Sequence, residues 1–80
     1  MTLKGEIVGI STPFSWGKDR SQILKIRRSK GVFAKAELLN NLNLLNGFKV
    51  GDNVEITYNL KSAYRRTVII KTIDHGANVA

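Results

Sequence analysis

Cationic and aromatic side chains alternate between Phe14 and Lys35, and this tract holds the residues best suited to chemistry. Its aromatics are Phe14, Trp16 and Phe33, and Asp19 is its single acid. Its cations are Lys18, Arg20, Lys25, Arg27, Arg28, Lys30 and Lys35. Positive charge neutralises phosphates and aromatic rings stack on unpaired bases. The tract therefore predicts binding of single-stranded nucleic acid with little sequence specificity.

Length and charge restrict the class of protein. Eighty residues, 42% hydrophobic and 24% charged, suit one small globular domain, because so short a chain cannot bury two cores. Thirteen Lys and Arg against six Asp and Glu give a net charge of +7, which favours a polyanionic partner. A membrane surface attracts the same charge, but the sequence has no basic amphipathic helix, so we expect no membrane partner.

The sequence offers no catalytic constellation. It has no cysteine and one histidine, His75, so neither a thiolate metal site nor a catalytic triad is expected. Glu6, Glu37 and Glu55 fall on different predicted elements, and no glycine-rich phosphate-binding motif is present. We therefore expect a protein that is not an enzyme and has no metal or cofactor. The lack of cysteine and of a signal h-region is typical of a cytoplasmic protein.

Alternation of apolar and polar residues predicts five strands, over residues 3–10, 22–28, 32–36, 54–61 and 66–73. Gly5 and Gly9 in the first strand predict a bulge or a tight bend. Residues 11–21 are expected to form a loop and residues 50–53 a turn. Residues 62–65 are expected to form a short loop, and residues 74–80 a frayed tail.

The second predicted strand is half-buried with a basic outer side. Leu24 and Ile26 share its inner face, whereas Ile23, Lys25 and Arg27 share the other. Residues 29–31 then predict a tight turn that uses a positive φ at the glycine.

Phe33 and Lys35 alternate with small apolar residues on the third predicted strand, Val32, Ala34 and Ala36, which would continue the core. Phe33 would then stand beside the outward cations of the second strand, where it can stack on a base. A register slip of one residue would turn Phe33 into the core instead. Both alternatives remain open from the sequence.

A helix is expected over residues 37–46, because Leu38, Leu42 and Leu45 follow helical spacing and Gly47 stands just past the end. Five strands with one helix between the third and fourth is the layout of the OB-fold, an all-β Greek-key barrel. We therefore expect residues 1–80 to form a single OB-fold domain with an ordered core over residues 3–73.

Three segments carry a resemblance to a known family. They read Ala34-Lys35-Ala36-Glu37-Leu38-Leu39, Phe48-Lys49-Val50-Gly51-Asp52-Asn53-Val54-Glu55-Ile56 and Asn59-Leu60-Lys61-Ser62. In this order they resemble the third strand, helix and fourth strand of bacterial and phage single-stranded DNA-binding proteins. No acid follows Asp74, whereas cellular members end in an acidic tip, so the compact phage or plasmid type is the nearer likeness. A similar helix, turn and strand occur in translation initiation factor one and S1-type RNA-binding domains.

The predicted binding residues come from both ends of the chain: Phe14, Trp16, Lys18, Arg20, Lys25, Arg27, Lys30, Phe33, Lys35, Tyr64, Arg65 and Arg66. For Trp16 and Phe14 the alternative is that the ring plugs one end of the barrel. Tyr58 is expected in the core, because it alternates with Val54 and Ile56.

The sequence leaves the partner open between single-stranded DNA, which we expect, and RNA or the ribosome. An alternative from a different class of function is a protein-interaction adaptor, which would dock through exposed Leu44, Leu45 and Phe48. The sequence does not distinguish a monomer from a homodimer.

Overall fold

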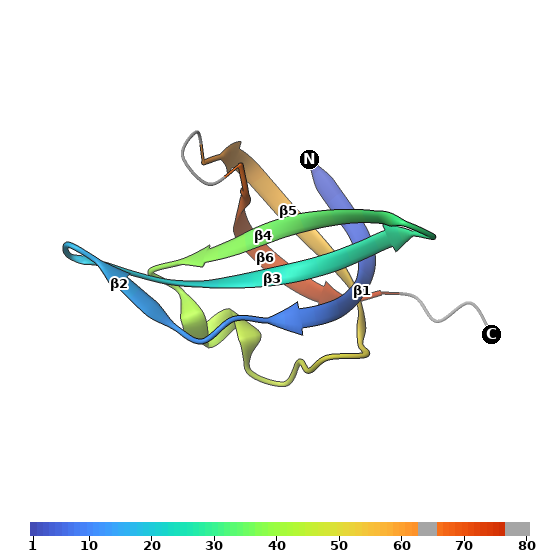
Figure 1. Cartoon of the computed structure of the whole chain (residues 1–80), viewed down its shortest axis with the longest axis horizontal. Helices are drawn as coiled ribbons and strands as arrows, with labels where there is room; N and C mark the ends of the chain where they lie inside the picture. Colours follow the sequence, from blue (N-terminus) through green and yellow to red (C-terminus); the bar gives the residue numbers. More distant parts are fainter. Residues whose placement is uncertain (63–65, 77–80) are drawn as a thin grey trace.

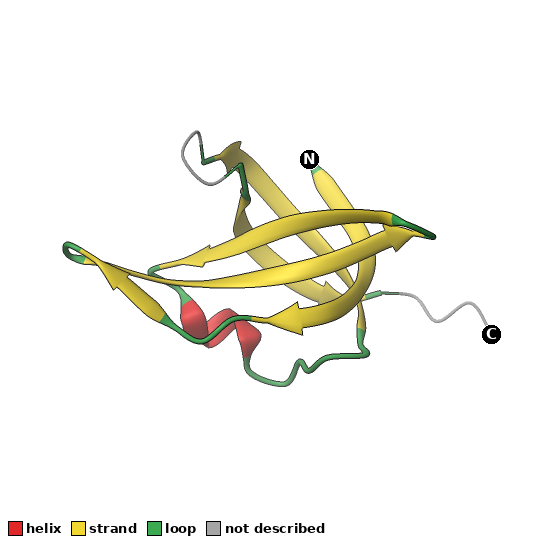
Figure 2. Ribbon diagram, viewed as in Figure 1, coloured by secondary structure: helices red, strands yellow, loops and turns green. Residues whose placement is uncertain are grey.

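The computed structural model describes residues 1–62 and 66–76 (Figure 1). These residues are mostly β, as predicted. The elements are β1 (Thr2–Ile10), β2 (Phe14–Trp16), β3 (Asp19–Ser29), β4 (Val32–Leu39), the 3-10 turn η1 (Leu42–Leu45), β5 (Asn53–Lys61) and β6 (Val68–His75). The described strands form one sheet in the order β1-β5-β6-β4-β3-β2, and a further pairing of β1 with β3 closes five of them into a ring (Figure 2). No helix in this part of the chain is long and apolar enough to cross a membrane.

β1 closes the ring because it pairs with two strands in turn. Its first half pairs with β5 and its second half with β3, and the strand bends between them (Figure 1). The register with β3 shifts between Ile7 and Gly9, which confirms the predicted bulge. Gly5 lies at the crossing, where a Cβ atom would stand 2.4 Å from the carbonyl oxygen of Arg27. The backbones therefore approach too closely there for any side chain.

The ring encloses one core, to which every strand of the ring contributes. Its buried apolar residues are Leu3, Ile7, Leu24, Ile26, Ala36, Leu38, Val54, Ile56, Val68, Ile70 and Ile73. The predicted faces of β3 are confirmed, because Leu24 and Ile26 are buried while Lys25 and Arg27 are exposed. Gly31 has a φ of 74° in the turn to β4, also as predicted.

Residues 11–21 are not the loop that the sequence predicts. β2 pairs with the beginning of β3, Phe14 opposite Ser21 and Trp16 opposite Asp19, and Gly17 turns the chain with a φ of 61°. The two strands form an arm, residues 14–21, that projects beyond the ring (Figure 1). β2 has three residues and no full apolar alternation, which is why its sequence reads as a loop.

Residues 37–46 do not form the predicted helix. β4 continues through Glu37 and Leu38 to Leu39, and only the single turn η1 follows. Leu38 reaches the core from the strand, while Leu42 and Leu45 pack against it from η1. The three leucines therefore contact the same core and are spaced in the sequence as in a helix, although they belong to two different elements.

Asn40 ends β4 in place of a helix. It has a φ of 55°, and its side-chain oxygen accepts a hydrogen bond from the backbone N–H of Arg20 at 2.8 Å. Its side-chain nitrogen donates to the carboxylate of Asp19 at 2.9 Å. Asparagine side chains compete for backbone hydrogen bonds in this way and so oppose helix formation.

The turn before β5 forms as predicted and is tied to the bend of β1. The backbone N–H of Lys49 donates to the carboxylate of Asp52 at 2.9 Å, which lowers the pKa of that carboxyl below its usual value. The carbonyl oxygen of Asp52 accepts from the N–H of Ile7 at 2.9 Å, and the N–H of Gly51 donates to the carbonyl oxygen of Ile7 at 2.8 Å. The turn thus fixes β1 where it changes partner.

The two last strands depart from the predicted alternation. The register between β5 and β6 shifts on both sides of Tyr58, so Leu60, which continues the alternation of Val54, Ile56 and Tyr58 in the sequence, is 67% exposed. β6 continues through Asp74 and His75, which the sequence placed in a frayed tail. The ring of His75 remains exposed but stacks on Phe48, with 4.4 Å between ring centroids.

Gly5→Ala should lower the free energy of unfolding by about 1 to 3 kcal/mol, because the added methyl group clashes with the backbone of β3. Gly9→Ala is the matched control, since its Cβ would meet no described atom nearer than 3.5 Å. Urea unfolding followed by circular dichroism measures both. Equal stability of the two variants would contradict the close crossing at Gly5.

Candidate nucleic-acid interface

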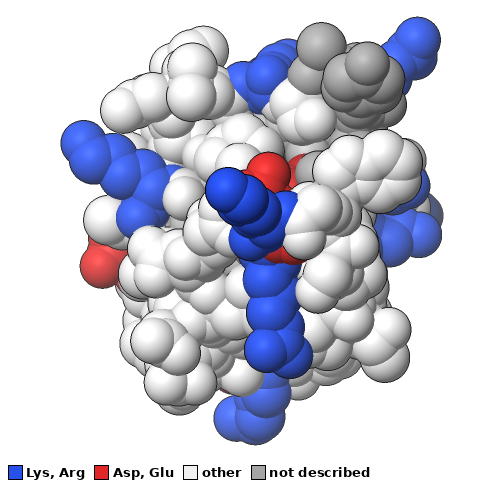
Figure 3. All heavy atoms as spheres, turned by 90° about the vertical axis from the view of Figure 1, so that its left-hand side faces the viewer, with Lys and Arg blue, Asp and Glu red and all other residues white. Residues whose placement is uncertain are grey.

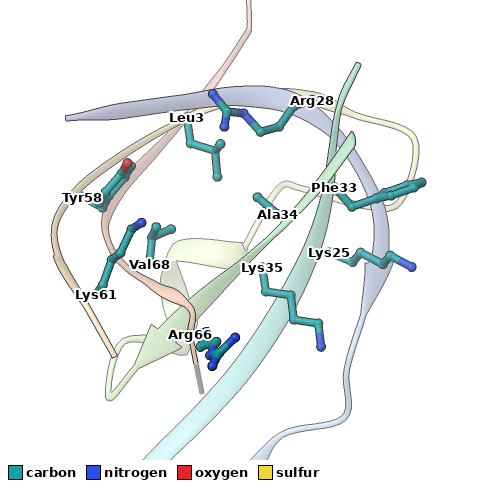
Figure 4. A pocket seen from close by; sticks show the side chains of 10 residues that line it. All are labelled: Leu3, Lys25, Arg28, Phe33, Ala34, Lys35, Tyr58, Lys61, Arg66 and Val68. Carbon is teal, nitrogen blue, oxygen red and sulfur yellow. The ribbon is translucent and has the colours of Figure 1, made fainter. Parts of the chain in front are cut away.

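A hollow of about 360 Å³ lies on one side of the ring and draws residues from all five of its strands (Figure 4). The residues that line it are Leu3, Lys25, Arg28, Phe33, Ala34, Lys35, Tyr58, Lys61, Arg66 and Val68. They are far apart in the sequence. The parallel pairing of β4 with β6 brings Arg66, which precedes β6, to the same place as Phe33 and Lys35.

The floor of the hollow is apolar and its rim is polar. Leu3, Ala34 and Val68 lie between the two walls, and each of them packs in or against the core. Tyr58 and Lys61 stand on one wall, and Phe33 and Lys25 on the other (Figure 4). Arg28 lies at one end, and Arg66 at the opposite end. An apolar floor with a charged rim suits a ligand that has a flat ring and an anionic backbone.

The rim carries positive charge only. Of the ten described residues that line the hollow, five are Lys or Arg and none is Asp or Glu. Lys25 and Lys35 are direct cross-strand partners on β3 and β4, so two like charges face each other. Such a pair destabilises a sheet. A bound anion between them would remove that cost.

Phe33 faces the solvent on the wall of the hollow. It is 49% exposed, which excludes the alternative that its ring is packed in the core. The ammonium of Lys25 lies 4.6 Å from the centre of its ring, a cation–π contact. Tyr58, which the sequence assigns to the core, is half-buried: it packs against the core and also lines the hollow. The hollow therefore has an aromatic side chain on each wall.

The structure does not bring all of the predicted binding residues together. Lys25, Phe33, Lys35 and Arg66 line the hollow. Phe14, Trp16, Lys18 and Arg20 belong to the arm or its turn, outside the hollow. Trp16 is 74% exposed, so it does not plug the ring, and Phe14 is half-buried.

Arg27 and Lys30 lie beside the hollow. They line a second depression near the β3–β4 turn, which Arg28 and Phe33 border as well. The guanidinium of Arg27 forms an ion pair with the carboxylate of Glu6, so its charge is already partly compensated. Tyr64 and Arg65 lie outside the described residues.

Arg28 and Lys61 also line the hollow, but they are not among the binding residues predicted from the sequence. The β3–β4 register shifts between Arg27 and Ser29, which leaves Arg28 without a partner in the ladder. The shifts beside Tyr58 similarly change which face of β5 Lys61 occupies. Bulges of this kind re-aim side chains, and a simple alternation does not predict them.

Positive charge also extends beyond the hollow. Figure 3 views the molecule from the end at which the arm projects, and Lys and Arg side chains form a band down the middle of this face. A few acidic atoms interrupt the band. Among the residues that the structure describes, no group of three or more His, Asp or Glu side chains could hold a metal ion. The described surface is thus suited to an anionic polymer.

Comparison of the chain with protein-family models, with curated proteins and with solved structures found no match.

Lys35→Glu should raise the free energy of unfolding by about 0.2 to 1 kcal/mol, because it converts the pair with Lys25 from repulsive to attractive. Lys35→Gln, which removes only the repulsion, should gain less. Urea unfolding at low salt measures both, and high salt should reduce the difference. A loss of stability in Lys35→Glu would show that the two lysines do not repel each other.

Proposed function

We propose that this protein binds single-stranded nucleic acid, with single-stranded DNA as the expected ligand, and that the hollow is the main contact. The observation that carries the proposal is a rim of five cations and two aromatic rings over an apolar floor, with no acid among the described lining residues. Electrostatic contacts to phosphates supply most of non-specific affinity, and stacking supplies much of the rest.

The topology supports an OB-fold, which we infer for the ring. A central hairpin, β3 and β4, pairs on one side with β1, and β4 pairs in parallel with β6 on the other. In folds of this type the second and third strands of the barrel present the face that binds single strands. The corresponding strands here are β3 and β4, which carry Lys25, Phe33 and Lys35. The resemblance to compact single-stranded DNA-binding proteins supports the same conclusion.

The geometry suits a single strand better than a duplex. Phe33 and Tyr58 can stack only on bases whose faces are free, and in a duplex those faces are covered by neighbouring bases. Arg28 and Arg66 at the two ends of the hollow can each bind a phosphate through two parallel hydrogen bonds. The strand would therefore run along the hollow with its backbone at the rim and one or more bases over the floor.

The arm would extend this contact. Trp16 is the most exposed aromatic residue that the structure describes, and Lys18 and Arg20 follow it in the same hairpin. An exposed indole beside two cations has the composition of a second stacking site for the same strand.

The adaptor alternative has less support. It requires an exposed patch of Leu44, Leu45 and Phe48, whereas all three are half-buried and pack against the core. Nothing in the geometry selects deoxyribose over ribose. A competition among oligo-dT, oligo-U, duplex DNA and tRNA therefore forms part of the test, with preference for RNA favouring the RNA alternative.

Binding should weaken with salt. If all five rim cations neutralise a phosphate, the logarithm of the association constant should fall with the logarithm of salt concentration with a slope of about 3.5. Fluorescence anisotropy of a labelled oligo-dT, titrated at several salt concentrations, measures the slope. An affinity that does not change with salt would contradict the proposal.

Phe33→Ala should weaken oligo-dT binding by about 1 to 3 kcal/mol, because a stacking surface is lost while the rim charge stays the same. Val50→Ala is the matched control, since Val50 is similarly exposed but does not line the hollow. The same anisotropy titration compares them. Equal affinities would show that Phe33 does not contact the ligand.

A further inference from the structure

A buried carboxylate joins three parts of the chain. Glu37 of β4 is fully buried, with 0% of its surface exposed. The hydroxyl of Ser21, on β3, donates to one of its oxygens at 2.8 Å, and the hydroxyl of Thr67, just before β6, donates to the other at 2.9 Å. Ser21 and Thr67 are themselves buried. A buried carboxyl needs such donors, so these three residues are fixed relative to one another.

Arg66 precedes Thr67 and has an unusual backbone conformation. Its φ is 54°, in the left-handed region that residues other than glycine rarely adopt. Its N–H donates to the carbonyl oxygen of Ser62 at 3.0 Å, and the N–H of Ser62 donates to the carbonyl oxygen of Thr67 at 2.7 Å. A conformation of this kind costs free energy and persists only where the surroundings enforce it.

The strained residue is also one that lines the hollow. Strained backbone conformations are concentrated at binding and catalytic sites, because function needs a side chain in a direction that the relaxed backbone does not give. Glu37 lies two residues after Lys35 on β4, and Lys35 lines the same hollow. The contact from Glu37 to Thr67 therefore connects the strand that holds Lys35 to the segment that holds Arg66.

We propose that Glu37 and Thr67 are positioning residues, which hold Arg66 in its left-handed conformation so that its guanidinium faces the hollow and binds a phosphate of the strand. This inference rests on the proposed function. Glu37 and Thr67 are buried and do not touch the ligand; they act through Arg66.

The test is a double-mutant cycle read by binding of labelled oligo-dT. Thr67→Val keeps the shape of the side chain but removes the hydroxyl, and Thr67→Ser keeps the hydroxyl. Thr67→Val should weaken binding roughly three- to tenfold, as expected for coupled groups, whereas Thr67→Ser should bind like the wild type. In an Arg66→Ala background, Thr67→Val should cause no further loss. In a Lys25→Ala background, on the far wall of the hollow, the loss should persist in full.

Loss of the same size in both backgrounds would overturn the inference, because Thr67 would then act on the whole fold. If the wild type binds oligo-dT and Thr67→Val binds it equally well, the inference is also overturned, but the proposed function is not. Failure of the wild type to bind oligo-dT would instead refute the proposed function, and the positioning role with it. Circular dichroism must show that each variant is folded at the temperature of the titration.

A comparison of Arg66→Gly with Arg66→Ala keeps the inference testable if Thr67→Val does not fold. Both variants lack the guanidinium and should bind equally weakly. Only glycine adopts a positive φ without strain, so Arg66→Gly should melt at a higher temperature than Arg66→Ala. Equal melting temperatures would show that no strain is held at this position, and wild-type affinity in either variant would show that the guanidinium does not bind the strand.

Discussion

The close crossing of β1 over β3 at Gly5 is the constraint on which the other features depend. Because glycine has no side chain, the two backbones can approach this closely. β1 can then leave β3 and join β5 within one strand, and the ring closes. Closure places Leu3 on the floor of the hollow and brings β5 round to face the β3–β4 hairpin. The turn at Gly51 and Asp52 holds the bend from the other side. A glycine with no chemistry of its own therefore permits the closure of the ring.

The hollow combines two features that oppose the stability of the fold. Lys25 and Lys35 face each other across neighbouring strands, and Arg66 has a backbone conformation that arginine disfavours. Both features cost free energy in the unbound protein. Both also lie at one surface, whereas the core beneath is apolar and the described buried polar groups are hydrogen-bonded. Concentration of unfavourable features at one site is typical of a surface that a ligand completes.

Local alternation was sufficient to predict β3, the β3–β4 turn and most of β5, because each of these has one buried and one exposed face. It failed where side chains from different elements meet in the core. Leu38 and Leu42 follow a helical period although one lies in a strand and the other in η1. Two of the cations that line the hollow could not be predicted for the same kind of reason. Arg28 and Lys61 line it because of register shifts, which depend on pairing partners and not on the local sequence.

The pairing of β1 with β5 joins residues that are far apart in the sequence, Leu3 with Ile56 for example. Contacts so distant in sequence are slow to form, because the chain must lose the entropy of a long loop before they stabilise anything. The β3–β4 hairpin is local by contrast, so we expect it to form early and the β1–β5 seam late. A chain still emerging from the ribosome could thus present Phe33 and Lys35 but no hollow. The proposed contact with a strand would then form only after β5 and β6 have been synthesised and have joined the sheet.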